Sequence, residues 1–467
     1  MKSSRNKCGI GYVSSNFLDA YTMLRGIEHR GQETTGIARI KNGKINVIRW
    51  LGEIYEKSFR EYRDLEREME EDSEFLVHTR YATRGSKQEL LRDAHPVTID
   101  GKDIFDGENY YTREATSAIV HNGQVVDVND LIKKFKLKTG SDTELLLRLY
   151  KKEGIESLME QIPASYSMII SDSDGVVGCR DRYGIKPLWY GEKDGLPILC
   201  SEDFPIRKIG GKPEREIKPG EIVYIKGGTI SIEKFSKPRE KFCFFEFNYL
   251  ADPNSQFREE KVWDVRKSLG AKLAEEVEIK DGDLVMPVPN SGRAYAIGFQ
   301  EEIGLPYLPE LEKLSFKRSF IQSTKKDRER LIEENLYLRD ANALHGKSIV
   351  VEDDSVIRGN VVDRVVQLLK KAKAKKVYYL SGTPPIGKNE NCYCCYGVDM
   401  PSEDEFIIRK FGTEERISRY ISDKYKIEFK LHYISEEGLF DVLPGKRESY
   451  CAQCITGECP LYEEVQI

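Results

Sequence analysis

The chain has 467 residues, of which 39% are hydrophobic and 32% are charged, and its formal net charge is −5. At roughly 150 residues per domain this length predicts two or three domains, and two large ones are the simplest fit. The composition excludes a disordered protein, no apolar run approaches the roughly 18 residues of a membrane span, and no basic stripe marks a nucleic-acid site. We therefore expect a soluble, cytoplasmic protein with no membrane and no nucleic-acid partner.

The first 225 residues alternate between expected strands and a few helices. A strand is expected at 8–13 and a helix at 17–28, and Asn42-Gly43 predicts a hairpin turn between strands at 35–40 and 45–50. A second helix is expected to begin near Ser141. Further strands are expected at 75–79, 118–121, 166–171, 176–180 and 221–225. This pattern indicates a layered antiparallel α+β domain.

After a polar junction at 236–240, the pattern changes to strands that alternate with helices. Short apolar runs are followed by helical patterns that begin near Ala294 and Val361, and the first of these patterns is expected to stop at Gly304. The apolar runs lie at 284–288, 348–351 and 377–380. Such alternation indicates a parallel sheet, and parallel sheets place their binding sites at the carboxyl ends of the strands.

Cys8 follows a seven-residue polar stub that is too short and too polar for a secretory signal. If residues 1–7 are a propeptide, their removal makes Cys8 the first residue. Its α-amine, with an ordinary pKa of about 7.7–8.0, can then act as general base for its own thiol. The alternative for an arbitrary cysteine is a small buried hydrophobe on a strand.

Five segments that follow Cys8 in order favour the nucleophile. They are EHRGQETTGI at 28–37, HTRYATRG at 78–85, VHNGQVV at 120–126, SDTELLL at 141–147 and RDRYGIKPLWYG at 180–191. With Cys8 they resemble the glutaminase domain of class II glutamine amidotransferases, which are N-terminal-nucleophile hydrolases. The resemblance implies an αββα sandwich over residues 8–235.

The same resemblance implies roles for individual residues. Asn122 and Gly123 match the oxyanion hole that serves the nucleophile Cys8, and donors placed there are worth a few kcal/mol each. The fork of an arginine suits the carboxylate of glutamine, and an aspartate suits its ammonium group. Taken singly, Asn122-Gly123 is also a good turn, and an aspartate before a helix is also a good cap. The implied glutamine-binding residues are Arg30, Arg80, Thr83 and Asp142.

The stretch SIVVEDDSVIRGN at 348–360 runs from a buried strand into two adjacent carboxylates. Carboxylates at a strand end can bind ribose hydroxyls, and the loop and next helix N-terminus can hold a phosphate. An acidic loop that caps a helix is the alternative. The stretch resembles the phosphoribosyl pyrophosphate (PRPP) motif of type I phosphoribosyltransferases, most closely that of the glutamine PRPP amidotransferase (amidophosphoribosyltransferase) family. The implied PRPP and Mg²⁺ site comprises Ser291, Asp353, Asp354, Ser355, Arg358 and Gly359.

Other segments extend this resemblance over the chain after residue 7. They are CFFEFNYLADPNSQF at 243–257, PVPNSGRAYAIGF at 287–299 and SGTPPI at 381–386, and they imply a phosphoribosyltransferase-like domain at 236–467 that ends in a cysteine-rich segment. The sequence also departs from the family. Asn360 and Val361 replace two threonines, Asn290 replaces an aspartate, and the flexible-loop region 312–340 keeps only part of its pattern.

Six of the ten cysteines lie after residue 390, in C-x-C-C and C-x₂-C spacings. Without an export signal, clustered cysteines favour metal binding over disulfides, and a C-x₂-C pair can ligate one metal site. In family members with a [4Fe-4S] cluster, the ligand positions map onto Cys243, Cys394, Cys451 and Cys454. Four thiolates suit zinc equally. The pattern leaves Cys392, Cys395 and Cys459 unassigned.

The resemblance implies an enzyme that makes 5-phosphoribosylamine from PRPP and glutamine, the first step of de novo purine synthesis. Ammonia released at Cys8 would displace pyrophosphate in the second site, with Mg²⁺ bridging the substrate oxygens. The family also implies a homotetramer or homodimer that purine nucleotides inhibit. The departures leave two alternatives open: a paralogue that delivers ammonia to another phosphorylated acceptor, and a non-catalytic nucleotide-sensing regulator.

Overall fold

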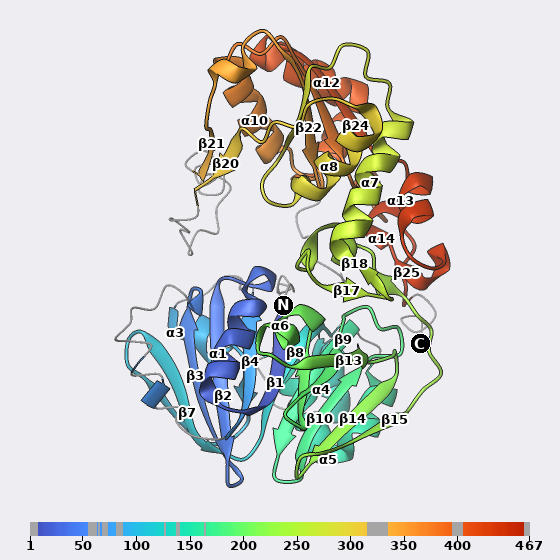
Figure 1. The fold of residues 1–467 in the computed structure, drawn as a ribbon. Helices are drawn as coiled ribbons and strands as arrows, with labels where there is room; N and C mark the ends of the chain where they lie inside the picture. The colour runs from blue at the N-terminus through green and yellow to red at the C-terminus, as the bar shows by residue number, and fades with distance from the viewer. Residues whose placement is uncertain are drawn as a thin grey trace.

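The computed structural model describes residues 8–54, 63, 66–67, 73–80, 87–125, 128–136, 141–162, 165–314, 335–394 and 405–461. Two antiparallel sheets lie in its N-terminal half, and a parallel sheet with helices lies in its C-terminal half (Figure 1). Among the described helices, none has the length and apolar character that a bilayer crossing requires.

The first sheet has nine strands in the order β13-β11-β12-β1-β4-β2-β3-β7-β6. The turn between β2 and β3 has Asn42 at φ 51° and Gly43 at φ 70°, which confirms the predicted hairpin. Strand β1 lies in the middle of the sheet and begins one residue after Cys8. The strand bounds are β1 Gly9–Ser15, β2 Thr34–Lys41, β3 Lys44–Leu51, β4 Ser73–Arg80, β6 Lys102–Phe105, β7 Asn109–Ala115, β11 Trp189–Lys193, β12 Leu196–Cys200 and β13 Lys212–Glu216.

The second sheet has six strands in the order β15-β14-β10-β9-β8-β5. It packs on the first sheet through a buried apolar layer that includes Tyr12 and Leu76 from one sheet and Val120 and Ile169 from the other. The strand bounds are β5 Val97–Thr98, β8 Ala118–Gln124, β9 Ser165–Asp172, β10 Gly175–Arg180, β14 Glu221–Lys226 and β15 Thr229–Lys234.

Helices cover the outer faces of both sheets. Helices α1 (Phe17–Gly26) and α6 (Asp203–Lys208) lie on the first sheet, while α4 (Val128–Phe135) and α5 (Asp142–Gln161) lie on the second. Helix α5 begins where predicted, because the Ser141 hydroxyl accepts the N–H of Glu144. The layers are therefore helix, sheet, sheet and helix, and the predicted αββα sandwich is confirmed.

The parallel sheet has the order β19-β22-β23-β24, with bounds Leu284–Pro287, Ser348–Asp353, Lys376–Ser381 and Glu428–Tyr433. Helices α7 (Val262–Glu276) and α8 (Gly292–Ile303) cover one face, and α10 (Asn360–Lys371) and α12 (Glu414–Tyr425) cover the other. As predicted, α8 stops at Gly304, which has φ 74°. This doubly covered sheet confirms the predicted α/β half.

The shorter described elements lie mostly at loops and at the junction. They are α3 Lys87–Arg92, α11 Ile407–Phe411, α13 Glu436–Val442, α14 Gln453–Thr456, β16 Phe242–Cys243, β17 Gln256–Phe257, β18 Glu260–Lys261, β20 Leu311–Lys313, β21 Leu336–Leu338, β25 Tyr450–Cys451, η1 Glu28–Arg30, η3 Glu246–Leu250, η4 Asn342–Leu344 and η6 Arg447–Ser449.

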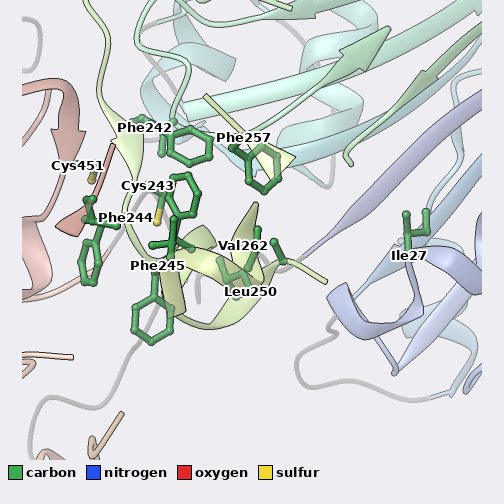
Figure 2. Packing of buried hydrophobic residues seen from close by; sticks show 14 of the residues in the cluster. Ile27, Phe242, Cys243, Phe244, Phe245, Leu250, Phe257, Val262 and Cys451 are labelled. Carbon is green, nitrogen blue, oxygen red and sulfur yellow. The ribbon is translucent and has the colours of Figure 1, made fainter. Parts of the chain in front are cut away.

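One apolar cluster joins the two halves. It runs from the helix-covered face of the first sheet, at Ile27, through the run Phe242–Phe247 to α7 and the C-terminal segment (Figure 2). Strand β16 pairs in parallel with β25, which fixes the C-terminal segment against the junction. Element η3, a short π-helix, follows directly. Because the cluster is continuous, the two halves share one buried apolar core.

Candidate active site

Cys8 lies at the start of β1 and is 2% exposed. A Cβ on the next residue, Gly9, would stand 2.7 Å from Ile27 and 2.8 Å from the hydroxyl of Thr79, so a glycine is needed there. The carbonyl oxygen of Cys8 accepts a hydrogen bond from Nε of Arg30 at 3.1 Å. The backbone of the candidate nucleophile is therefore held firmly at the N-terminal end of β1.

Arg30 joins this backbone to two buried carboxylates. Its guanidinium bonds Glu246 at 2.7 and 3.0 Å and Glu202 at 2.6 Å, and all three side chains are buried. Burial alone would lower the pKa of Arg30, but Glu246 and Glu202 hold it above its ordinary value. Burial would likewise raise the pKa of Glu202, yet His29 and Arg30 hold it well below its usual range. Sequence reasoning found Arg30 but missed both glutamates, which lie 172 and 216 residues away.

The predicted oxyanion-hole residues lie side by side on β8. Asn122 is fully buried, and neither its amide nitrogen nor its amide oxygen has a hydrogen-bond partner in the described part of the chain. A Cβ on Gly123 would stand 2.1 Å from the carbonyl oxygen of Ser165 on β9, so only glycine allows this close pairing. A buried amide without partners is costly unless a ligand satisfies it. Both residues thus suit the binding of a polar ligand atom.

Two of the predicted glutamine-binding residues surround the same strand. Arg80 ends β4 and donates to the carbonyl of Asp93 at 2.6 Å, and Asp142 begins α5. Arg80 and Asp142 both act electrostatically on His121, the residue before Asn122. The structure therefore brings Arg80, Asp142 and Asn122 into one region, whereas Thr83 lies outside the described residues.

The strand-end acidic pair lies at the carboxyl end of β22. Oδ2 of Asp353 accepts the hydroxyl of Tyr379 at 2.6 Å, and Oδ2 of Asp354 accepts the hydroxyl of Ser355 at 2.6 Å. Burial and the neighbouring Asp354 raise the pKa of Asp353 well above its usual range. A cation or a set of hydroxyl donors would stabilise such a pair of carboxylates.

The other predicted PRPP-site residues lie along the same edge of the sheet. Ser291 directly precedes α8. A Cβ on Gly292 would stand 2.2 Å from the carbonyl oxygen of Glu352, so the backbone of this loop packs closely against the end of β22. Gly359, with φ 84°, precedes α10, and Arg358 pairs with Glu405 at 2.8 Å. Residues 315–334 of the predicted flexible loop lie outside the described residues.

Sequence reasoning missed Glu352, which is fully buried at the carboxyl end of β22. Neither of its carboxylate oxygens has a partner within the described ranges. Burial and Asp353 raise its pKa well above the usual range. The sequence signal was a third acidic residue before the pair, in a strand that is otherwise apolar.

Element η3 connects the two candidate sites. Two residues after Glu246, the amide nitrogen of Asn248 donates to the carbonyl of Gly382 at 2.8 Å and to the hydroxyl of Thr383 at 3.0 Å. That hydroxyl donates to the carbonyl of Asp354 at 2.7 Å. Through Arg30 and η3, the backbone of Cys8 is thus linked to the backbone of the acidic pair.

The four cysteines predicted as cluster ligands come together at the junction. Cys243 and Cys451 are paired across β16 and β25, and all four are less than a tenth exposed. Burial and the thiol of Cys394 raise the pKa of Cys243 to about 12, and burial with the other thiols raises those of Cys451 and Cys454 well above the usual range. Within the described ranges, no three His, Cys, Asp or Glu side chains are arranged as a ready metal-binding group.

The three unassigned cysteines differ in their surroundings. Cys392 is buried, and its Sγ lies 3.4 Å from the carbonyl of Ile455, while Cys459 is half-buried. Cys395 lies outside the described residues.

Comparisons with known proteins agree with one another, and the relatives cover nearly the full length of the chain. A family described as the glutamine amidotransferase domain matches residues 105–207. The amidophosphoribosyltransferase of Archaeoglobus fulgidus is 33% identical over 460 residues, which cover 95% of this chain and 94% of that protein. That of Methanocaldococcus jannaschii is 30% identical and covers 97% of both. The solved glutamine PRPP amidotransferase of B. subtilis, in complex with ADP and GMP, superposes with a TM-score of 0.81 at 26% identity and covers 98% of each chain.

Proposed function

The chain belongs to the amidophosphoribosyltransferase family, and from that premise we propose that it transfers the amide nitrogen of glutamine to PRPP. The product is 5-phosphoribosylamine, and the reaction opens purine synthesis. The observation that carries the proposal is the linkage, through Arg30 and η3, of a buried cysteine site to a strand-end acidic pair. Neither the paralogue with another acceptor nor the non-catalytic sensor is favoured.

The glutaminase half uses Cys8 as nucleophile once residues 1–7 have been removed. The new α-amine takes the proton of the thiol, and the sulfur attacks the side-chain amide carbon of glutamine. Asn122 Nδ2 and the N–H of Gly123 donate to the oxyanion that forms. Ammonia leaves with the proton from the α-amine, and water then hydrolyses the thioester to glutamate.

The other residues of this half bind the substrate or support the nucleophile. Arg80 suits the α-carboxylate of glutamine and Asp142 its ammonium group, with Thr83 as a further proposed contact. Arg30 is engaged by two buried glutamates and by the Cys8 carbonyl. We therefore assign Arg30 to holding the nucleophile segment in place rather than to direct contact with glutamine.

The second half binds PRPP at the carboxyl edge of the parallel sheet. Asp353 and Asp354 accept the ribose hydroxyls, while the 355–359 loop and the start of α10 hold the 5′-phosphate. Ser291 and its loop face the pyrophosphate, and Arg358 supplies positive charge. The oxygen-rich carboxylate pair fits Mg²⁺, which when bound neutralises charge on the leaving pyrophosphate. Although Asn290 and Val361 depart from the family pattern, the carboxylate pair is intact, which supports PRPP as the acceptor.

A coupled assay tests this function. Purified protein given glutamine, PRPP and Mg²⁺ is expected to release glutamate and pyrophosphate in equal amounts, because ammonia made in one site is consumed in the other. Ammonium chloride in place of glutamine serves as the control and is expected to support pyrophosphate release without glutamate. Glutamate release without any pyrophosphate would contradict PRPP as the acceptor.

We also propose that Cys243, Cys394, Cys451 and Cys454 hold a [4Fe-4S] cluster. Burial and the neighbouring thiols, that of Cys394 included, raise the pKa of Cys243, Cys451 and Cys454, and such a buried group fits a cationic cofactor because bound metal removes the thiol protons. The role is structural, because the four residues join β16, β25, α14 and the 391–394 segment.

Metal analysis distinguishes the cluster from zinc. Protein purified without oxygen is expected to contain about four iron atoms per chain and to be brown. Cys454→Ser is expected to lose both properties, whereas Cys459→Ser, its matched control, keeps them. Stoichiometric zinc without iron would replace the cluster by a zinc site.

We further propose the domain bounds, the assembly, the location and the regulation of the protein. The glutaminase domain spans residues 8–235 and the phosphoribosyltransferase-like domain 236–467. The protein assembles as a homodimer or homotetramer in the cytoplasm. Purine nucleotides inhibit it, which is supported by the ADP and GMP bound to the B. subtilis protein.

A further inference from the structure

Three of the six histidines form a buried group behind the glutaminase site. His78 lies on β4, His95 lies between α3 and β5, and His121 lies on β8 directly before Asn122. The rings of His78 and His95 are 4.0 Å apart, and those of His95 and His121 are 6.3 Å apart. All three are at most 5% exposed. The hydroxyl of Thr143, the second residue of α5, completes the group.

Two backbone contacts fix where the ring protons lie. The backbone N–H of His121 donates to Nδ1 of His95 at 3.4 Å, so that nitrogen is an acceptor. Nε2 of His78 lies 3.2 Å from the carbonyl oxygen of His121 and 2.8 Å from the same Nδ1 of His95, so Nε2 of His78 carries a proton. Because burial lowers the pKa of all three rings, each is neutral at pH 7 and has one ring proton.

The remaining protons follow in order. His95 has its proton on Nε2 and donates it to the hydroxyl oxygen of Thr143 at 3.0 Å. The hydroxyl of Thr143 then donates to Nδ1 of His121 at 3.2 Å, which is shorter than its 3.4 Å contact with Asp142. His121 therefore carries its proton on Nε2. The chain of donors runs in one direction, from His78 to His121.

The last N–H of this chain lies beside Gly123 of the proposed oxyanion hole. Nε2 of His121 lies 2.8 Å from the position that a Cβ on Gly123 would occupy, and it has no partner among the described residues. Asp142, the proposed ammonium ligand, directly precedes Thr143. The chain of hydrogen bonds thus connects the strand that carries Asn122 and Gly123 with the helix start that carries Asp142.

We propose that His78, His95, Thr143 and His121 are positioning residues of the glutaminase site. Their one-way chain of hydrogen bonds holds β8 in register with the start of α5, so that the oxyanion donors and the ammonium ligand address the same glutamine molecule. Thr143 is the central link, because its hydroxyl both accepts from His95 and donates to His121. This inference rests on the proposed glutaminase function.

Thr143→Val tests the central link, because it removes the hydroxyl and keeps the shape of the side chain. It is expected to lower kcat for glutamine hydrolysis about 100-fold, since small misplacements of a reacting group cost this much. KM for glutamine is expected to change far less. Thr143→Ser keeps the hydroxyl and is expected to restore most of kcat. Pyrophosphate release with ammonium chloride is expected to be unchanged in both variants.

Thr112→Val is the matched control, since it removes a buried hydroxyl on β7 that bonds Arg49 on β3 and Asp103 on β6. Its glutaminase kcat is expected to equal that of the unchanged protein. The inference is overturned if Thr143→Val keeps the kcat of the unchanged protein, or if Thr143→Ser fails to restore it. It is also overturned if the two Thr143 variants lower the thermal midpoint of unfolding and kcat in parallel. Failure of the proposed function would give a different result, because the unchanged protein itself would then not release glutamate and pyrophosphate in equal amounts.

Discussion

Replacing Cys8 by alanine is expected to abolish glutamine-dependent pyrophosphate release, with a loss of at least about 1,000-fold, because the nucleophile is removed. Pyrophosphate release supported by ammonium chloride is expected to persist, since the acidic pair at the end of β22 lies in the other half of the molecule. Parallel assays with glutamine and with ammonium chloride measure the two activities. A Cys8→Ala protein that still forms glutamate would contradict the assignment of the nucleophile.

Cys179→Ala is the control for this change. Cys179 is also fully buried on a strand of the same half, and burial raises the pKa of its thiol. Its replacement is therefore expected to leave both activities intact. The mass of the active protein tests the α-amine separately, because active chains that retain residues 1–7 would lack a free amine at Cys8.

Local signals in the sequence predicted much of the fold. Asn42-Gly43 predicted a hairpin, Gly304 predicted the end of α8, and Ser141 predicted the start of α5, because each acts on its own turn of backbone. Periodic apolar residues likewise predicted β22 and α10. The strand-end site followed from the same local pattern, since the carboxyl end of a buried parallel strand is a fixed place.

Contacts between distant segments were not predictable from spacing. The pairing of Arg30 with Glu246 depends on how the two halves dock, as does the π-helix that carries Asn248. The pairing of Arg30 with Glu202 joins segments 172 residues apart within the N-terminal half. The pairing of β16 with β25 also joins segments about 200 residues apart. The histidine chain needed His95, whose local sequence, DAHPV, carries no signal for a partner on another strand.

Replacing Arg30 by methionine is expected to lower the free energy of unfolding by a large amount, because Arg30 is the centre of a buried cluster of charges. Arg30→Met removes the cation that two buried carboxylates share, and it leaves Glu246 without either of its bonds to the guanidinium. Breaking a buried pair by removing one partner costs about 3–5 kcal/mol. Glu202 is affected less, because the hydroxyl of Ser255 and the N–H of Asp252 still donate to it.

Unfolding in urea, followed by circular dichroism, measures this loss against a matched control. Arg148→Met breaks a partly exposed pair with Glu144 on α5 and is expected to lower the free energy of unfolding by less than about 1 kcal/mol.

Adding Glu246→Leu to Arg30→Met is expected to recover part of the stability, because the unpaired buried carboxylate is then gone. The recovery would not extend to glutamine hydrolysis, since the carbonyl of Cys8 still lacks its donor. If Arg30→Met lowers the free energy of unfolding no more than Arg148→Met does, the cluster does not hold the nucleophile segment to η3. If the double variant recovers full glutaminase activity, the contact between Arg30 and Cys8 is not needed to place the nucleophile.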